Sequence, residues 1–439
     1  MLGNGGCRGC ALKSAFVKAW GHPHRDRYLW GALYVGCTAY FFLRFIRHPG
    51  GAELYRDAAQ CLWDQKVLQV CDWIFTYNPA FAFIMLPSIA VPMWLMLAVW
   101  FAITVACAIW CCRLCERLVV TTFRGKWSDR DREVLRLFGI LISLKFILAV
   151  FENQGFDLLV LPALLIGILA LAQGRDVLSG VSLAAATALK VTPLLFLPYL
   201  VFKGRFVAAA VFAVALTLFC FLPDLFFHPQ GGEHGYFLAW VHDVAIAGLT
   251  ENPAAAPHPF WNGANPLNLS LRGALALALD GTSYASDFKT WLRVLQVAFA
   301  AVIGAMLLAS RKKDLVPIDG AVLIIAILML SPMSSRDHFV SLLLPYYLIV
   351  AGVMRAQRAA FIGITILVLS FWFTGIPREI VPYAYSEFVR MHSDSVYATL
   401  LLLVYLGMMI GSPKSWGIPQ TDHAQIDQQK IEREPLHAT

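Results

Sequence analysis

Long apolar runs without charge recur along the whole chain and constrain its fold more than any other feature. Two examples are "VLPALLIGILALA" at 160–172 and "AVLIIAILML" at 321–330. Of the 439 residues, 59% are hydrophobic and 14% are charged. Several apolar stretches approach or exceed the roughly 20 residues that a helix needs to cross the hydrocarbon core. Because a membrane-spanning backbone must satisfy its own hydrogen bonds, we predict an all-α, polytopic membrane protein.

The apolar stretches predict a bundle of about ten to twelve membrane segments. The first begins near Leu29 and has no small-residue cleavage site, so we interpret it as a retained span. Apolar character pervades the chain, which predicts one domain over residues 1–411. The tail 412–439, rich in Gln, Asp and Glu, is predicted to be disordered and cytoplasmic. The expected segments are 29–46, 80–112, 134–151, 156–173, 177–190, 192–202, 206–226, 291–310, 317–332, 338–354, 359–375 and 394–411.

Prolines predict breaks in two of these segments. The stretch 80–112 is too long for one straight crossing, and Pro87 and Pro92 predict a short buried helix followed by a full span. The stretches 177–190 and 192–202 are each too short to cross, and Pro193 lies at their junction. We therefore expect a broken or re-entrant pair of helices held inside the protein.

The basic residues indicate which loops face the cytoplasm. If every predicted segment crosses once, the Lys and Arg groups all fall on one side of the membrane, which the positive-inside rule assigns to the cytoplasm together with both termini. The net charge of +7 therefore reports topology and predicts no nucleic-acid partner. These groups are Lys13 to Arg27, Arg113 to Arg132, Arg175, Lys203 and Arg205, Arg311 to Lys313, and Arg355 with Arg358. The outer segments are then 47–79, 152–155, 227–290, 332–338 and 376–393.

The ten cysteines allow two interpretations. The pairs Cys7/Cys10 and Cys112/Cys115 have the spacing of zinc ligands, but small apolar side chains in or near helices explain them better. Cys61 and Cys71 fall on the outer side by the predicted topology, where a disulfide is open but not deducible.

The stretch "GGAELYRDAAQCLWDQ" at 50–65 predicts an amphipathic helix along the membrane surface. Its three- and four-residue steps place Glu53, Asp57, Gln60 and Asp64 on one face. A solvated acidic stripe explains this face as well as a catalytic role does.

A polar group and a deeply placed lysine mark the next candidate site. Glu152, Asn153 and Gln154 open one span, and Lys190 lies between two short apolar helices. A lysine this deep must pair with an anion or extend its ammonium to the membrane surface. The functional alternative is a cation that binds a phosphate at the outer membrane boundary, beside the amide groups of the broken helix.

The long outer segment holds "NPLNLSLRGAL" at 265–275. Asn265, Asn268 and Ser270 precede a predicted helix at 269–279, so they either cap that helix or hydrogen-bond a sugar. Trp261, in the Pro-rich stretch before them, is suited to packing against a sugar face or a lipid headgroup. The stretch thus predicts a substrate-facing loop or a helix cap.

The motif "LSPMSSRDHFVSLLLPYY" at 330–347 places ionisable groups between two apolar runs. Arg336 is a fixed cation suited to phosphate, and His338 donates to a phosphate oxygen or shuttles a proton. The alternative is a salt bridge between Arg336 and Asp337 that ties the loop together. Ionisable groups beside lipid favour the functional interpretation.

The chain resembles the polyprenyl-phosphate-sugar-dependent glycosyltransferases of family 87, a group that includes bacterial mannosyltransferases. The resemblance covers about residues 28 to 410. The matching elements, in order, are "YRDAAQCL", "YNPAFAFIMLP", "NQGFDLLVLPALLIGILAL", "GVSLAAATALKVTPLLFLPYLVFKGRF", "NPLNLSLRG" and "LSPMSSRDHFVSLLLP".

This resemblance implies a GT-C helical bundle with its active site at the extracytoplasmic face of the cell membrane. By position, Asp57 matches the expected catalytic base, His338 the histidine after the Ser-Pro motif, and Lys190 the lysine before Pro. Asn268 and Ser270 match the Asn-x-Ser motif. The histidine motif commonly holds a second His, which this chain replaces with Asp337 or Phe339.

The resemblance further implies transfer of a hexose from a polyprenyl-phosphate sugar to a lipid or glycan acceptor. Since phosphate is a good leaving group, one base suffices, and we expect inversion at the anomeric carbon. Asp57 takes this role, with Lys190, Arg336 and His338 stabilising the phosphate. Mannose is favoured, and arabinose, galactose and glucose stay open.

The sequence shows no Gly-rich phosphate loop and no acidic metal pair, so we predict no nucleotide, cofactor or obligatory metal. Membrane lipids are the only other expected partners, with no obligatory protein. Two rival functions remain. One is a transporter or flippase for a lipid-linked intermediate, and the other is a polymerase or ligase for whole saccharides.

Overall fold

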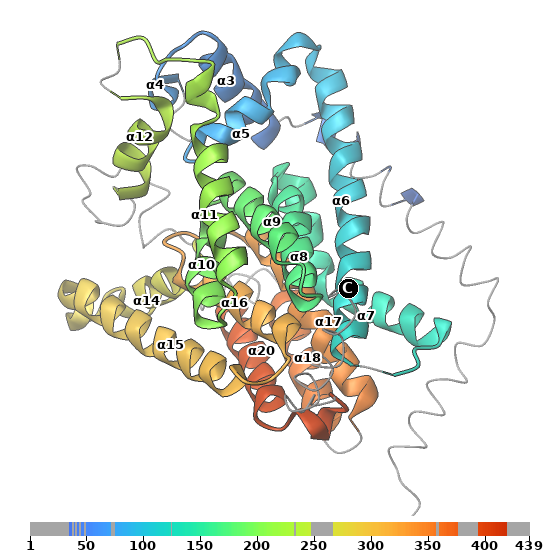
Figure 1. Ribbon diagram of the computed structural model, residues 1–439. Coiled ribbons are helices and arrows are strands. Elements are labelled where there is room, and N and C mark those ends of the chain that lie inside the picture. The colour runs from blue at the N-terminus through green and yellow to red at the C-terminus, as the bar shows by residue number, and fades with distance from the viewer. Residues whose placement is uncertain are drawn as a thin grey trace, which may run out of the picture.

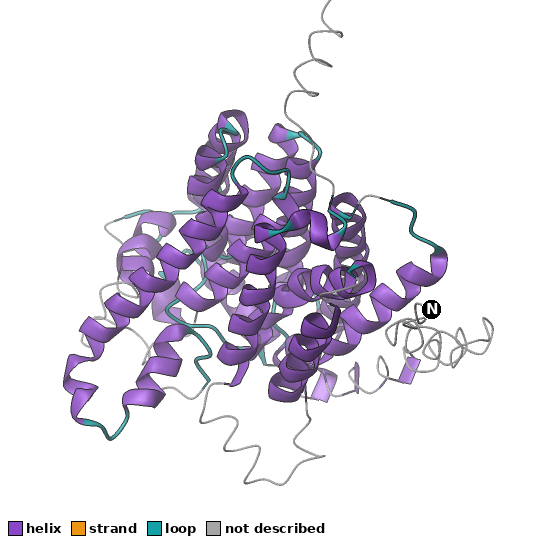
Figure 2. Ribbon diagram, turned by 90° about the horizontal axis from the view of Figure 1, so that it is seen from below, coloured by secondary structure: helices purple, strands orange, loops and turns teal. Residues whose placement is uncertain are grey.

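The computed structural model describes residues 50–71, 75–123, 125–231, 234–246, 267–356, 360–375 and 394–418, with scattered residues between 35 and 47. Throughout these residues the chain forms helices and turns and no strand (Figure 2). Successive helices run up and down a single bundle (Figure 1). The predicted all-α class is confirmed.

Short helices gather at the upper end of the bundle in Figure 1, where α3 (Gly51–Trp63), α4 (Leu68–Cys71) and α5 (Pro79–Ile84) lie near α12 (Tyr236–Trp240). The amphipathic prediction for α3 is confirmed, because its acidic stripe is exposed while Tyr55, Ala58 and Leu62 are buried. A disulfide joins Cys61 to Cys71 and ties the end of α3 to α4.

The proline break predicted in 80–112 is present. After α5, the 3₁₀ helix η1 (Leu86–Ala90) contains Pro87, and Pro92 immediately precedes α6 (Met93–Thr122). Cys112 and Cys115 are buried in α6 as free thiols, as expected of small apolar side chains. Next comes α7 (Asp129–Asn153), whose start is capped by Ser128 and Asp131.

The break predicted at Pro193, between the stretches 177–190 and 192–202, is also present. An antiparallel hairpin is formed by α8 (Asp157–Ala172) and α9 (Asp176–Leu189), which pack together. Beyond α9 the chain is extended at Lys190 and then forms η2 (Thr192–Leu195) and α10 (Phe196–Phe202). Pro193 has no N–H to continue the helix, which explains the break. The helix α11 (Phe206–Phe221) then packs against α9.

The second half of the chain completes the bundle. Its helix at 271–279 begins two residues after the predicted start at 269. The chain is also packed beyond Ser412, because the ring centres of Trp416 and Tyr405 lie 4.8 Å apart. Residues 413–416 thus form a short helix at the start of the stretch that we expected to be a tail. The elements are η3 (Pro223–Leu225), η4 (Val241–Ile246), α14 (Leu271–Leu279), η6 (Ser283–Asp287), α15 (Phe288–Ser310), α16 (Val316–Leu330), η7 (Arg336–Leu342), α17 (Leu343–Arg355), α18 (Ala360–Gly375), α20 (Asp394–Gly411) and η8 (Pro413–Trp416).

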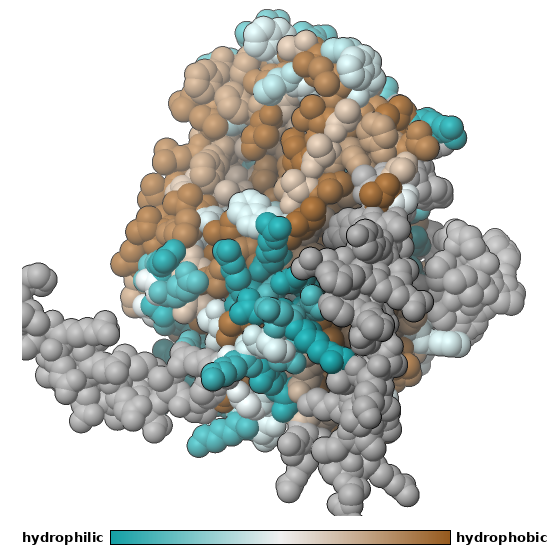
Figure 3. All heavy atoms as spheres, turned by 90° about the vertical axis from the view of Figure 1, so that its right-hand side faces the viewer, coloured by the Kyte–Doolittle hydropathy of each residue, from teal (hydrophilic) through white to brown (hydrophobic). Residues whose placement is uncertain are grey.

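Within the described residues, four helical stretches are long and apolar enough to cross a membrane, and nine shorter apolar ones accompany them. The four are Met93–Thr122, Asp129–Asn153, Ser283–Ser310 and Arg336–Arg355. The side view shows an apolar surface over most of one face, with polar side chains gathered toward the lower end (Figure 3). This surface is typical of a polytopic membrane protein.

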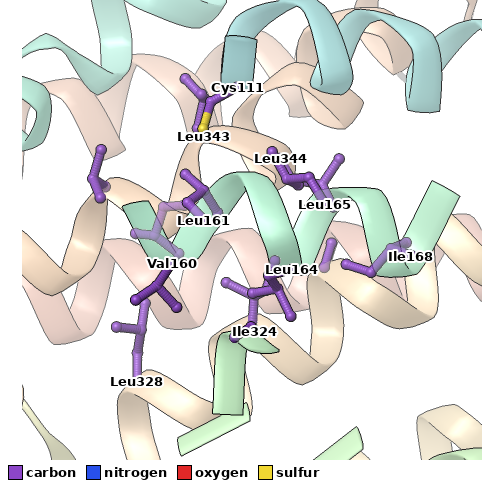
Figure 4. Packing of buried hydrophobic residues seen from close by; sticks show 14 of the residues in the cluster. Cys111, Val160, Leu161, Leu164, Leu165, Ile168, Ile324, Leu328, Leu343 and Leu344 are labelled. Atoms are coloured by element: carbon purple, nitrogen blue, oxygen red, sulfur yellow. The ribbon is translucent and has the colours of Figure 1, made fainter. Parts of the chain in front are cut away.

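The centre of the bundle is built around α8. Val160 and Leu164 on α8 face Leu328 and Ile324 of α16, while Leu165 approaches Leu344 of α17 (Figure 4). All of these side chains are buried. Because α8 is fixed on several sides, the residue at its first position, Asp157, is held in a defined place.

Candidate functional site

The turn between α7 and α8 brings the polar sequence 152–157 against the motif at 331–338. Gln154 has a left-handed backbone with φ of 54°, and Gly155 follows it. A Cβ atom on Gly155 would lie 3.0 Å from Asp337 Oδ2 and 3.6 Å from Asp157 Oδ2. A glycine here therefore allows two carboxylates to approach the same backbone position.

Lys190 meets Asp157 at the open end of the α8–α9 hairpin. The two residues are 33 positions apart, yet Lys190 Nζ lies 2.5 Å from Asp157 Oδ1. The side chains are 14% and 8% exposed, so this ion pair is largely shielded from water. Lys190 Nζ also lies 5.8 Å from the ring centre of Phe156. Asp157 starts α8 and Lys190 ends α9, so each charge complements the dipole of its own helix.

The 331–338 motif supplies the other polar groups. Ser335 precedes η7, its hydroxyl donates a short hydrogen bond to Asp337, and its N–H lies 3.3 Å from His338 Nδ1. One ligand-type atom from each of Asp157, Asp337 and His338 lies within 4.8 Å of the others. Among the described residues, this is the group of His, Cys, Asp and Glu whose spacing admits a metal ion, although the Lys190 ammonium already contacts Asp157.

A cavity opens beside these groups. Its polar lining includes Asp157, Lys190 and His338, and its apolar lining comes from α8, η2 and α16. The cavity has a volume of about 40 Å³, which holds only a few water molecules. The lining therefore combines charged and polar side chains with an apolar wall. The remaining lining residues are Val160, Leu161, Leu164, Thr192, Pro193, Ile324, Ile327, Leu328, Ser331, Ser334, Val340 and Ser341.

Aromatic side chains connect this cavity to α3. The Tyr55 ring contacts the rings of Tyr77, Phe81 and Phe156, with centroids 5.9, 4.9 and 5.8 Å away. Burial, then the neighbouring Tyr77 phenol and the charges of Asp337 and Asp157, raise the pKa of Tyr55 well above its ordinary value. The phenol therefore stays protonated and forms a neutral wall beside the two carboxylates.

Asn268 and Ser270 support the motif at 331–338. The Asn268 amide donates to the Pro332 carbonyl at 2.9 Å, and its oxygen accepts from the N–H groups of Ser270 and Ser334 at 3.1 and 3.2 Å. The Leu269 N–H donates to the Ser334 carbonyl at 2.7 Å. Ser270 caps α14. Of the two roles considered, the structure shows helix capping for Ser270, and Asn268 holds the 331–338 loop.

Replacing Asn268 by Asp is expected to impair activity and stability with little change in side-chain size. The carboxylate cannot donate to the Pro332 carbonyl, and it introduces a buried charge at a site that is 0% exposed. We expect at least a tenfold loss of activity and a lower Tm, because unsatisfied buried groups cost about 1–3 kcal/mol. Activity and thermal unfolding of Asn268→Asp, with Asn268→Gln as a comparison, test this. Wild-type values for both variants would contradict it.

Gln154 and Asn153 are placed differently from each other. The Gln154 side chain is 1% exposed, accepts from the N–H groups of Gly50 and Ala52 at 2.8 and 3.1 Å, and donates to the Phe45 carbonyl at 3.0 Å. These bonds fix the beginning of α3, so the Gln154 side chain has a structural role. Asn153 is the exposed last residue of α7.

Asp57 and Arg336 are not among the residues that line the cavity. Asp57 is exposed on α3, on the face opposite buried Tyr55, and Arg336 is the first residue of η7. Asn265 and Trp261 lie outside the described residues. The structure thus brings together Lys190 and His338 of the predicted site and places Asn268 and Ser270 behind them.

Asp157 was not predicted as a site residue. It lies in "NQGFDLL", but a single Asp before an apolar run also fits an ordinary helix start, so its residue type gave no separate signal. Asp337 was considered as a partner for Arg336 and as a replacement for the second His of the motif, not as a neighbour of Asp157. The two carboxylates are 180 positions apart, and only the fold shows that both lie beside His338.

A model of glycosyltransferase family 87 matches residues 75–332. The match includes Asp157 and Lys190, begins after Asp57 and ends before His338. Comparison with curated proteins and with solved structures returned no match. Because the matched stretch covers more than half of the 439 residues, the chain belongs to glycosyltransferase family 87.

Proposed function

We propose that this membrane glycosyltransferase transfers a hexose from a polyprenyl-phosphate sugar to a lipid or glycan acceptor at the extracytoplasmic face. The observation that carries the proposal is the cavity with Lys190 and His338 at one end and the apolar side chains of α8 and α16 along its wall. A polyprenyl phosphate has the same division between an anionic head and a hydrocarbon chain. Mannose is the first sugar to test.

In this proposal the lysine and the histidine bind the phosphate. Lys190 supplies a full positive charge in a site shielded from water, where it stabilises the charge that grows on the leaving phosphate. His338 donates a second hydrogen bond. Arg336 is proposed to approach the same phosphate from the start of η7. Since Lys190 supplies the positive charge, we expect transfer to persist in the presence of a chelator.

Asp57 is proposed as the base for the acceptor hydroxyl. It is exposed on α3, which reaches the cavity through the rings of Tyr55 and Phe156. Attack from the side opposite the phosphate gives inversion at the anomeric carbon, which NMR of the product would reveal.

The disulfide supports an extracytoplasmic position for α3 and α4, because disulfides persist in oxidising compartments. In intact cells, a membrane-impermeant maleimide is expected to label Cys61 and Cys71 only after reduction with a membrane-impermeant reductant. The signal should disappear in the Cys61→Ser/Cys71→Ser variant. Labelling that requires permeabilised membranes would contradict this orientation.

The direct experiment is transfer in membranes or nanodiscs supplied with labelled polyprenyl-phosphate mannose and a lipid extract. A labelled glycolipid that depends on the protein supports the proposal. Movement of intact lipid-linked sugar between leaflets without transfer would indicate a flippase. Transfer of whole oligosaccharides would indicate a polymerase or ligase.

A further inference from the structure

The carboxylate of Asp157 stands between Lys190 and any anion that enters the cavity. Its Oδ1 atom lies 2.5 Å from Lys190 Nζ, and both side chains are largely buried. The ammonium therefore has a full opposite charge as its partner in this structure. A phosphate that binds Lys190 must compete with Asp157 or share the ammonium with it.

Two carboxylates lie at this site. Asp157, Lys190 and His338 line the cavity, and Asp337 lies within 4.8 Å of Asp157 and His338, atom to atom. The buried phenols of Tyr55 and Tyr77 on the adjoining wall are neutral. If Asp157 lost its charge, Asp337 would remain as a nearby anion for Lys190.

The ion pair also restricts the space available. The cavity is small, at about 40 Å³, and both members of the ion pair line it. The Lys190–Asp157 contact joins the end of α9 to the start of α8 at this cavity. The flexible four-carbon stem of lysine allows the ammonium to move without a backbone shift.

We propose that Asp157 is the exchange partner of Lys190. The ammonium moves from Asp157 to the phosphate when the donor binds, and it returns to Asp157 when polyprenyl phosphate leaves. The spent lipid is a phosphomonoester, which carries more negative charge at neutral pH than the donor's phosphodiester. Competition from Asp157 therefore promotes product release. Asp157 is a positioning residue that acts through Lys190, and its role rests on the proposed function.

The test compares Asp157→Asn and Asp157→Glu with the wild type in a transfer assay inhibited by polyprenyl phosphate. Removing the competing charge in Asp157→Asn is expected to lower the inhibition constant of polyprenyl phosphate about tenfold. The donor KM should fall less and kcat should fall, because release becomes slower. Asp157→Glu keeps the charge and should stay within about threefold of the wild-type inhibition constant. In a Lys190→Ala background, Asp157→Asn should no longer produce the tighter inhibition.

Several outcomes would overturn the inference. Weaker inhibition with a raised KM in Asp157→Asn would make Asp157 a support that orients Lys190. Activity that depends on added Mg²⁺ or Mn²⁺ would make it a cation ligand. If Asp157→Asn does not fold, Asp157→Glu still tests the inference. This variant keeps the charge, so a tenfold lower inhibition constant for polyprenyl phosphate would contradict competition by charge. A wild-type protein that neither transfers sugar nor responds to polyprenyl phosphate would instead refute the proposed function.

Discussion

Replacing Lys190 by Ala is expected to reduce transfer by at least two orders of magnitude. The variant loses the ammonium that faces the leaving phosphate, and loss of one such donor typically costs a factor of about 10²–10³ in kcat. It also leaves the buried Asp157 carboxylate without its partner, and breaking a buried ion pair costs about 3–5 kcal/mol. Transfer rates and thermal unfolding of the purified variant measure the two effects.

The double variant Lys190→Ala/Asp157→Asn separates these effects. It removes both charges, so we expect Tm to recover toward the wild-type value while transfer stays low. Lys190→Arg keeps a positive charge but changes its shape, and it should retain more activity than Lys190→Ala. Recovery of transfer in the double variant would contradict a direct role for Lys190 at the phosphate.

Replacing Asp57 by Asn is expected to lower transfer by about 10²–10⁴-fold, the usual range for loss of a general base. Binding of polyprenyl phosphate should stay unchanged, because Asp57 does not line the cavity that holds Lys190 and His338. The assay compares transfer with lipid binding in the same preparation.

Glu53→Gln is the matched control for Asp57→Asn. Glu53 lies one helical turn earlier on the same exposed face of α3, so its neutralisation should leave transfer within about twofold of the wild type. Wild-type activity in Asp57→Asn, with a large loss in Asp337→Asn, would move the base to the cavity. That result would overturn the role taken from the family resemblance.

Much of the fold could be predicted from the chain because its strongest signals are local. Pro87, Pro92 and Pro193 each lie at a break between helices, because proline has no backbone N–H to donate. The apolar runs in turn indicate where the helices lie. The acidic stripe of α3 likewise follows from helical periodicity alone. The disulfide between Cys61 and Cys71 could not be deduced, because it depends on the path of the chain between them.

The site was predictable only in part, because its decisive contacts join distant residues. Lys190 and His338 were found because ionisable groups between apolar runs are unusual. Asp157 was missed because its charge is ordinary at a helix start, and its partner lies on the next helix. Gln154 looked like a ligand because it is polar, yet its hydrogen bonds hold α3. The type of a residue shows that its polar group needs a partner, but it does not show which residue provides that partner.

The measurement that tests the central claim most directly is a structure of the protein bound to polyprenyl phosphate or to a donor analogue with a stable phosphonate linkage. We predict a phosphate oxygen about 2.7–2.9 Å from Lys190 Nζ, with His338 beside it and the first hydrocarbon units between α8 and α16. A headgroup bound elsewhere, with the Lys190–Asp157 pair intact and the cavity empty, would contradict the account.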